Sequence, residues 1–198
     1  RRTDTLKRRN SDPHLTFHPI NPRRRLPRVG GFRSQTPQED IMSAQHIYVS
    51  APLGSIVRYS DGTPRPPARF KRKLAAWENN NSGGRLVKKT PSRDMPSCFL
   101  LAGITLHQGD FGSAGVVVLR VYKTFSVNCA LKFIVTEPPK PGSVRVLDRE
   151  GEAAELLYLA ADCTAAEAWL AAHRYPGAVL EDVTTDEVAA AAIDGRAA

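Results

Sequence analysis

The strongest constraint on the fold of this 198-residue chain lies in two neighbouring runs of β-branched and aromatic residues. They are VVVLRVY at residues 116–122 and VNCALKFIVT at residues 127–136. Such a composition is typical of strands that form a half-buried pleated surface. Because only residues 123–126 separate the two runs, we expect them to form an antiparallel pair. The sequence therefore predicts a sheet whose strands are mainly antiparallel.

Shorter strand-like segments precede these runs. Residues 46–50 (HIYVS), residues 55–59 (SIVRY) and the segment that begins at Leu86 are predicted strands. The apolar run 98–107 (CFLLAGITLH) is long enough for a central strand, with Gly103 at a bulge. The glycine-rich segment 108–115 (QGDFGSAG) is expected to be a turn. It lacks the lysine of a phosphate-binding P-loop, and its Asp-Phe-Gly triplet stands without the other kinase elements.

The C-terminal part predicts a β-β-α-β unit. Residues 143–147 and 155–160 flank a turn and form a predicted hairpin. Asp162 or Thr164 can cap a helix over 165–174, and residues 178–183 return as a strand. A short alanine-rich helix is expected over 184–193. The fold class is therefore α+β, with a mainly antiparallel sheet, an early basic amphipathic helix and one or two alanine-rich C-terminal helices.

The early helix is predicted within residues 63–90, and a strand follows it. Pro66 and Pro67 suit its first turn, where no backbone donor is needed. Three apolar residues recur at helical spacing and are expected to face the core rather than to stack on nucleic-acid bases: Phe70, Leu74 and Trp77. Gly83 and Gly84 follow an asparagine run and are expected to end the helix in a left-handed conformation.

Charge is unevenly distributed along the chain. The net charge of +8 separates into three parts: ten basic and four acidic residues over 1–41, ten basic and two acidic over 42–93, and eight basic and fourteen acidic over 94–198. The basic run is either the solvated side of an ordinary surface helix or a site for an anionic partner, nucleic acid or an acidic protein. The predicted binding residues on this helix and strand are Arg65, Arg69, Lys71, Arg72, Lys73, Arg85, Lys88 and Lys89.

Three functional hypotheses follow from these features. The first is a non-catalytic protein whose basic helix and strand contact nucleic acid or an acidic protein partner. The second is an enzyme with a site near residues 109–115, using His107, Asp110 or a cysteine. The third is a small accessory module whose acidic C-terminal half docks another protein. Because no catalytic, nucleotide-binding or metal motif is present, the enzyme is the less favoured hypothesis and no cofactor is predicted.

The cysteines and the hydropathy pattern indicate a reduced, cytoplasmic protein. Cys98, Cys129 and Cys163 form no CxxC pair and no cluster with histidine, which argues against zinc and against a disulfide framework. No run approaches the length of a membrane span, and no secretory signal is visible. The sequence is silent on oligomeric state.

Composition also predicts the domain organisation. Residues 1–43 are rich in arginine and proline and are expected to be a disordered leader. A single α+β domain is expected over 44–193, with a subdomain boundary at 137–142 (EPPKPG) and a frayed tail at 194–198. Residues 38–42 can be back-translated into a bacterial ribosome-binding sequence followed by a start codon. The hypothesis is that Met42 is the natural start and that residues 1–41 are translated upstream DNA.

Overall fold

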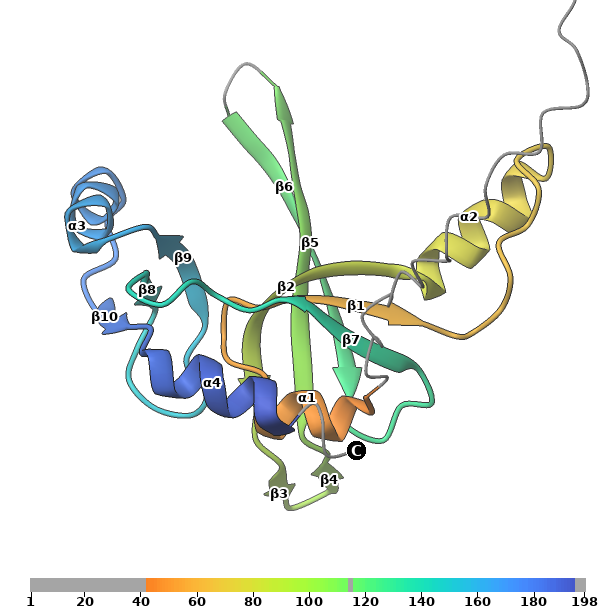
Figure 1. Cartoon of the computed structure of the whole chain (residues 1–198), viewed down its shortest axis with the longest axis horizontal. Coiled ribbons are helices and arrows are strands. Elements are labelled where there is room, and N and C mark those ends of the chain that lie inside the picture. The colour runs from red at the N-terminus through yellow and green to blue at the C-terminus, as the bar shows by residue number, and fades with distance from the viewer. Residues whose placement is uncertain (1–41, 114–115, 195–198) are drawn as a thin grey trace, which may run out of the picture. The chain divides into compact units, whose positions relative to one another are not determined.

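The computed structural model describes residues 42–113 and 116–194, which belong to one compact unit, Gln38–Ala198. Residues 1–41 of the predicted leader (1–43) and residues 195–198 of the predicted tail (194–198) lie outside the described residues. The described residues confirm the α+β class, with mostly antiparallel sheets and four helices (Figure 1). Their elements are α1 (Ala44–Ser50), β1 (Ile56–Ser60), α2 (Lys71–Asn80), β2 (Ser82–Thr90), β3 (Arg93–Met95), β4 (Cys98–Leu100), β5 (Gly103–Ser113), β6 (Val116–Ser126), β7 (Lys132–Glu137), β8 (Val144–Leu147), β9 (Leu156–Ala160), α3 (Cys163–Ala172), β10 (Val179–Asp182) and α4 (Thr185–Asp194).

The largest sheet has five antiparallel strands in the order β6-β5-β2-β1-β7. The predicted pairing of residues 116–122 with residues 127–136 is wrong, because β6 pairs with β5 whereas β7 pairs with β1 at the other side of the sheet. The prediction failed because β5 extends from Gly103 to Ser113 and pairs with β6 over the whole length of both strands. The chain then crosses to β1, whose unpaired side accepts β7.

The glycine-rich segment is a strand where the sequence predicted a turn. The run 98–107 is divided between β4 and β5, and β5 continues through Ser113. Register shifts at His107–Gly109 and Phe111–Gly112 let the strand absorb the glycines as bulges. Gly103 pairs at the start of β5, where an added Cβ would lie 2.9 Å from the carbonyl oxygen of Phe125. Close strand approach, rather than a bulge, therefore accounts for this glycine.

Residues 46–50 form a helix, so the predicted strand there is wrong. The Ser43 side chain accepts a hydrogen bond from the backbone N–H of His46 and caps α1. Ala44, Ile47 and Ala51 are buried on one side of α1 against the five-stranded sheet. The sheet contributes the rest of this core from β1, β2, β5, β6 and β7: Val57, Tyr59, Leu86, Ile104, Leu106, Phe125 and Phe133.

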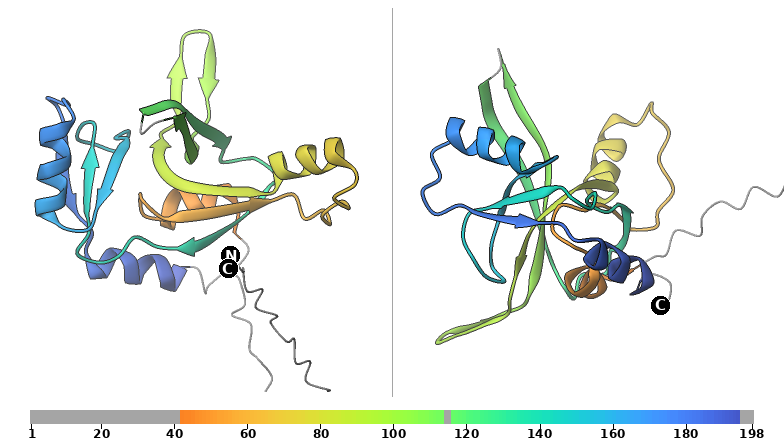
Figure 2. Two further views of the ribbon diagram at one scale, coloured as in Figure 1. Left: turned by 90° about the horizontal axis from the view of Figure 1, so that it is seen from above. Right: turned by 60° about the vertical axis from the view of Figure 1, so that its left-hand side comes forward.

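The predicted β-β-α-β unit is confirmed. Strands β8, β9 and β10 form a second antiparallel sheet in the order β10-β8-β9, and α3 packs on it through Ala166. The Asp162 side chain accepts a hydrogen bond from Ala165 N and caps α3. The unit joins the larger sheet where Val87 packs with Leu147 and Leu156. Helix α4 follows as predicted and lies beside α1 (Figure 2).

Helix α2 begins at Lys71, after the two prolines rather than with them. Gly83 and Gly84 lie in β2, directly after the helix, with ordinary strand geometry. Both are paired with β1, and a Cβ on Gly84 would lie 2.5 Å from the carbonyl oxygen of His107 on β5. The predicted left-handed helix end is therefore wrong. These glycines allow three strands to approach one another closely.

A buried arginine joins the C-terminal elements to the body of the structure. The guanidinium of Arg145 on β8 donates hydrogen bonds to the carbonyl oxygen of Leu53 at 2.9 Å, and to Glu181 and Glu187 at 2.8 Å each. These partners lie in the α1–β1 connection, β10 and α4. No helix among the described residues has the length and apolar character needed to cross a membrane.

Candidate functional site

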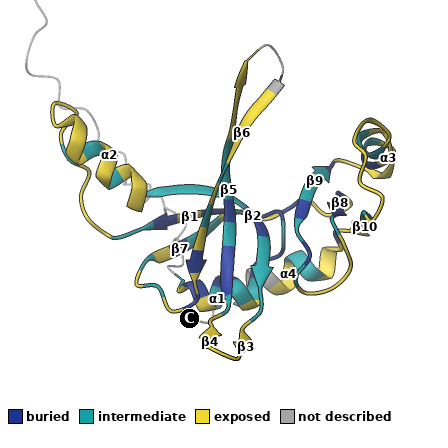
Figure 3. Ribbon diagram, turned by 180° about the vertical axis from the view of Figure 1, so that it is seen from behind, coloured by how far each residue is buried: buried dark blue, intermediate teal, exposed yellow. Residues whose placement is uncertain are grey.

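Helix α2 and the loop before it project from the five-stranded sheet, with their side chains largely in solvent (Figures 1 and 3). The helix contains no buried residue. The sequence-based expectation that Phe70 faces the core is wrong, because 43% of its surface is exposed. Trp77 and Leu74 are half-buried. The apolar side of this helix is therefore packed only in part, through Leu74 and Trp77.

Five of the eight predicted binding residues lie together in this projection, and all five are exposed: Arg65, Arg69, Lys71, Arg72 and Lys73. The guanidinium carbon of Arg69 lies 4.8 Å from the centroid of the Phe70 ring, and the amine of Lys73 lies 5.5 Å from it. An exposed aromatic ring therefore lies between cations. We refer to these five cations together with Phe70 as the α2 surface.

Polar contacts, rather than a core, hold the α2 surface in place. The Asp61 carboxylate accepts hydrogen bonds from the backbone and hydroxyl of Thr63 and from the side-chain amide of Asn81. The Trp77 indole N–H donates to the carbonyl oxygen of Thr63 at 2.8 Å. The hydrogen bonds from Thr63, and then those from Asn81, lower the pKa of Asp61 to about 2. Both ends of the loop–helix segment are thereby fixed to each other.

Among the described residues, few carboxylates lie near the positive charges of the α2 surface. Within the loop and helix, Glu78 approaches Arg65, with 3.8 Å between Oε1 and Nη2. At that distance, and with both groups exposed, the pair contributes little stability. Asp61 is engaged with its own loop. The positive potential of Arg69, Lys71, Arg72 and Lys73 is therefore directed to solvent.

The three predicted strand residues are oriented differently. Arg85 donates from Nη1 to the carbonyl oxygen of Gly54 at 2.8 Å, and Lys88 forms an ion pair with Glu155 at 3.2 Å. Burial lowers the pKa of Lys89, and Glu187 partly offsets that effect. Arg85 and Lys88 thus have partners inside the structure, and Lys89 is partly buried, so these three cations differ from the exposed cations of the α2 surface.

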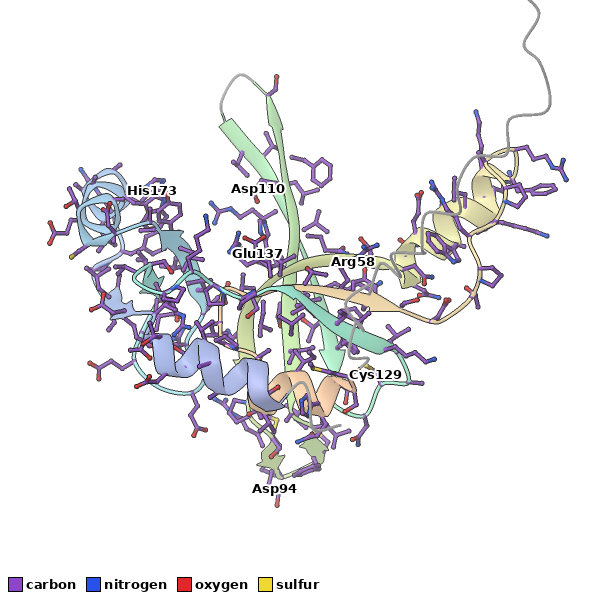
Figure 4. The ribbon with its side chains drawn as sticks, in the orientation of Figure 1. Arg58, Asp94, Asp110, Cys129, Glu137 and His173 are labelled. Carbon is purple, nitrogen blue, oxygen red and sulfur yellow. The ribbon has the colours of Figure 1, made fainter. Side chains whose placement is uncertain are left out.

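A cavity of about 340 Å³ lies at the C-terminal end of α2. It adds two cations that the sequence analysis did not select, Arg58 of β1 and Lys132 of β7, and Trp77 also lines it. Figure 4 labels Arg58 near the base of α2. Lys132 lies opposite Ser60, which is two residues along β1 from Arg58. That relation depends on the β1–β7 pairing, which no local signal in the sequence indicates.

The residues of the alternative enzyme hypothesis also meet in the structure. His107 Nε2 and Asp110 Oδ1 are 2.8 Å apart, and both residues line a second cavity. None of the three cysteines lines that cavity, so a cysteine nucleophile has no support there. Among the described residues no group of three or more histidine, cysteine, aspartate or glutamate side chains could hold a metal ion.

The model of one protein family, described as "Uncharacterised conserved protein UCP036055", matches residues 42–187. Comparison with curated proteins and comparison with solved structures both give no match. Because the matched region covers well over half of the chain, the protein belongs to this family.

Proposed function

We propose that this member of the family binds a nucleic acid through the α2 surface. The observation that carries the proposal is that the cations of the loop and of the first turn of α2 are exposed, on a helix that contributes no fully buried residue to the core. Surface helices usually bury one side, whereas in α2 only Leu74 and Trp77 are even half-buried. Exposed cations of this density attract phosphate groups through counterion release.

The exposed ring of Phe70 favours nucleic acid over an acidic protein. Single-stranded nucleic acids are bound by surfaces that combine cations with aromatic side chains, because every base has a flat face on which to stack. Phe70 lies between Arg69 and Lys73, so a base stacked on it would place its neighbouring phosphates near both charges. Arg58, Lys132 and the adjacent cavity extend the cationic path beyond the helix. An acidic protein surface would need the charges but not the exposed ring.

The proposal is tested with a fluorescein-labelled single-stranded oligonucleotide and fluorescence anisotropy at increasing salt concentration. The affinity is expected to fall steeply with salt, with a slope near −0.7 per phosphate contact. The triple variant Arg69→Ala, Arg72→Ala, Lys73→Ala removes three such contacts. It is expected to weaken binding and to reduce the magnitude of that slope by about 2.

A charge-matched control carries Arg93→Ala, Lys140→Ala and Arg174→Ala, three exposed cations outside the α2 surface. It lowers the net charge equally and is expected to bind almost as the wild type does. Equal losses in both triple variants would show non-specific attraction and overturn the proposal. Polyglutamate that binds as tightly as the oligonucleotide, with no effect of Phe70→Ala on the oligonucleotide, would instead assign the surface to an acidic protein.

A further inference from the structure

A row of polar side chains crosses three strands of the five-stranded sheet. Strand pairing places Arg85 of β2 opposite His107 of β5, and His107 opposite Tyr122 of β6. Residues directly opposite on neighbouring strands project from the same side of a sheet. The next pair on this side of the β5–β6 hairpin is Asp110 with Arg120, because a bulge between His107 and Gly109 shifts the register. This side is opposite to the core formed with α1.

Aromatic side chains from the C-terminal unit face this row. Tyr158 of β9 and Trp169 of α3 are stacked with nearly parallel rings, 4° apart in plane and 5.2 Å between centroids. His173 and Tyr175 stack on Trp169 as well, which holds the indole in a fixed orientation. The polar row, Tyr158 and Trp169 line one cavity of about 360 Å³. Figure 4 labels Asp110 on the hairpin and His173 directly after α3, the two elements that flank the cavity.

The charges in this cavity are unbalanced. Arg85 and Arg120 contribute two guanidinium groups, whereas Asp110 is the one carboxylate among the lining residues. That carboxylate is already engaged by His107 at 2.8 Å and by Arg120 at 3.6 Å. Each guanidinium has five N–H donors; Arg85 donates one to the carbonyl oxygen of Gly54, and Arg120 makes an ion pair with Asp110. The cavity therefore offers further cationic donors beside aromatic rings.

We propose that this cavity binds a small anion that carries a flat aromatic ring. The anionic group, a carboxylate or a phosphate, is held by Arg120 and Arg85, because a guanidinium matches either group with paired donors. The ring lies between Tyr122 on the sheet and the Tyr158–Trp169 stack. The volume lies within the range of pockets that enclose small ligands. This site is independent of the α2 surface, and its failure would leave the nucleic-acid proposal unaffected.

The test uses tryptophan fluorescence. The chain contains two tryptophans, so Trp77→Phe leaves Trp169, at the wall of the cavity, as the only emitter. This protein is titrated with adenosine 5′-monophosphate as the phosphate probe and with salicylate as the carboxylate probe. Adenosine and salicylamide are the uncharged counterparts. We expect saturable quenching by one charged probe. Its uncharged counterpart should bind at least about tenfold more weakly, because it cannot form the charge-assisted hydrogen bonds to arginine.

Two arginine variants locate the site. Arg120→Gln in the Trp77→Phe background is expected to weaken the bound probe about tenfold or more, whereas Arg149→Gln, on an exposed turn elsewhere, is expected to leave it unchanged. Circular dichroism checks that each variant is folded. Tyr122→Leu, a second lining variant, is likewise expected to weaken binding of the probe. Absence of saturable quenching by both charged probes overturns the proposal. Equal binding by Arg120→Gln and the parent protein overturns it as well.

Discussion

Replacement of Arg145 by methionine is expected to destabilise the fold more than any surface change. The side chain is 2% exposed, and its guanidinium makes three hydrogen bonds, two of them to carboxylates. Methionine keeps an apolar stem of similar length, so the substitution mainly removes the charged group. It therefore breaks the hydrogen bonds that attach β10 and α4 to the loop at Leu53.

The magnitude follows from these hydrogen bonds. A hydrogen bond to a neutral carbonyl contributes about 1 kcal/mol, and one to a charged partner about 1.5–3 kcal/mol. The Glu181 and Glu187 side chains are 53% and 36% exposed, so they regain water when the arginine is removed. This hydration reduces the loss, and the free energy of unfolding should fall by about 3–5 kcal/mol. Total stabilities of domains are about 5–15 kcal/mol, so the loss is a large share.

Urea unfolding followed by tryptophan fluorescence measures this loss. The matched control is Arg149→Met, four residues along the chain, where the arginine is exposed and binds the neighbouring Asp148. Its unfolding midpoint should coincide with that of the wild type. A loss below about 1 kcal/mol for Arg145→Met, the size of an average substitution, would show that the arginine does not hold these elements together.

Two further outcomes are expected. Gly84→Ala should strongly lower the thermal midpoint, because the new Cβ would lie 2.5 Å from the carbonyl oxygen of His107. The control Gly109→Ala should change the midpoint little, because its Cβ would meet only a side-chain atom at 4.0 Å. Equal midpoints for the two variants would refute the close approach at Gly84. The pKa of Asp61 is lowered to about 2, mainly by hydrogen bonds from Thr63, so its ionised form stabilises the fold above about pH 4 and this contribution is lost as the pH falls towards 2. The difference in thermal midpoint between the wild type and Asp61→Asn should therefore shrink over that range, and a constant difference would contradict the assignment.

The sequence predicted those parts of the fold whose signals are local. The C-terminal β-β-α-β unit was found because Asp162, the helix and the flanking strands each follow from nearby residues. The helix at 46–50 was missed because a five-residue apolar run has no distinguishing period, and its helical form depends on packing against a sheet made of distant strands. The pairing of β6 with β5 rather than β7 is likewise a choice between partners that only the assembled sheet decides.

The candidate site shows the same limit. The cations of the α2 surface are visible in the sequence as a basic run, and the structure leaves them exposed. The strand cations are equally basic in the sequence, but Lys88 meets Glu155, which lies far along the chain. The ring of Phe70 was expected in the core because its spacing matches an amphipathic helix, and nothing in that spacing reveals that the start of the helix projects into solvent.

The position of β6 as the outermost strand has a consequence for self-association. Its free side presents backbone donors and acceptors, a template on which another chain can add a strand. Val117, Val118 and Leu119 are exposed beside it, and Arg120 is the only charged side chain between residues 117 and 122. Charged residues in apolar edge strands oppose edge-to-edge aggregation, so we expect Arg120, the ion-pair partner of Asp110, to have this effect on β6. The Arg120→Gln protein should accordingly form higher-order species as its concentration is raised above that of the fluorescence titrations, which light scattering would detect.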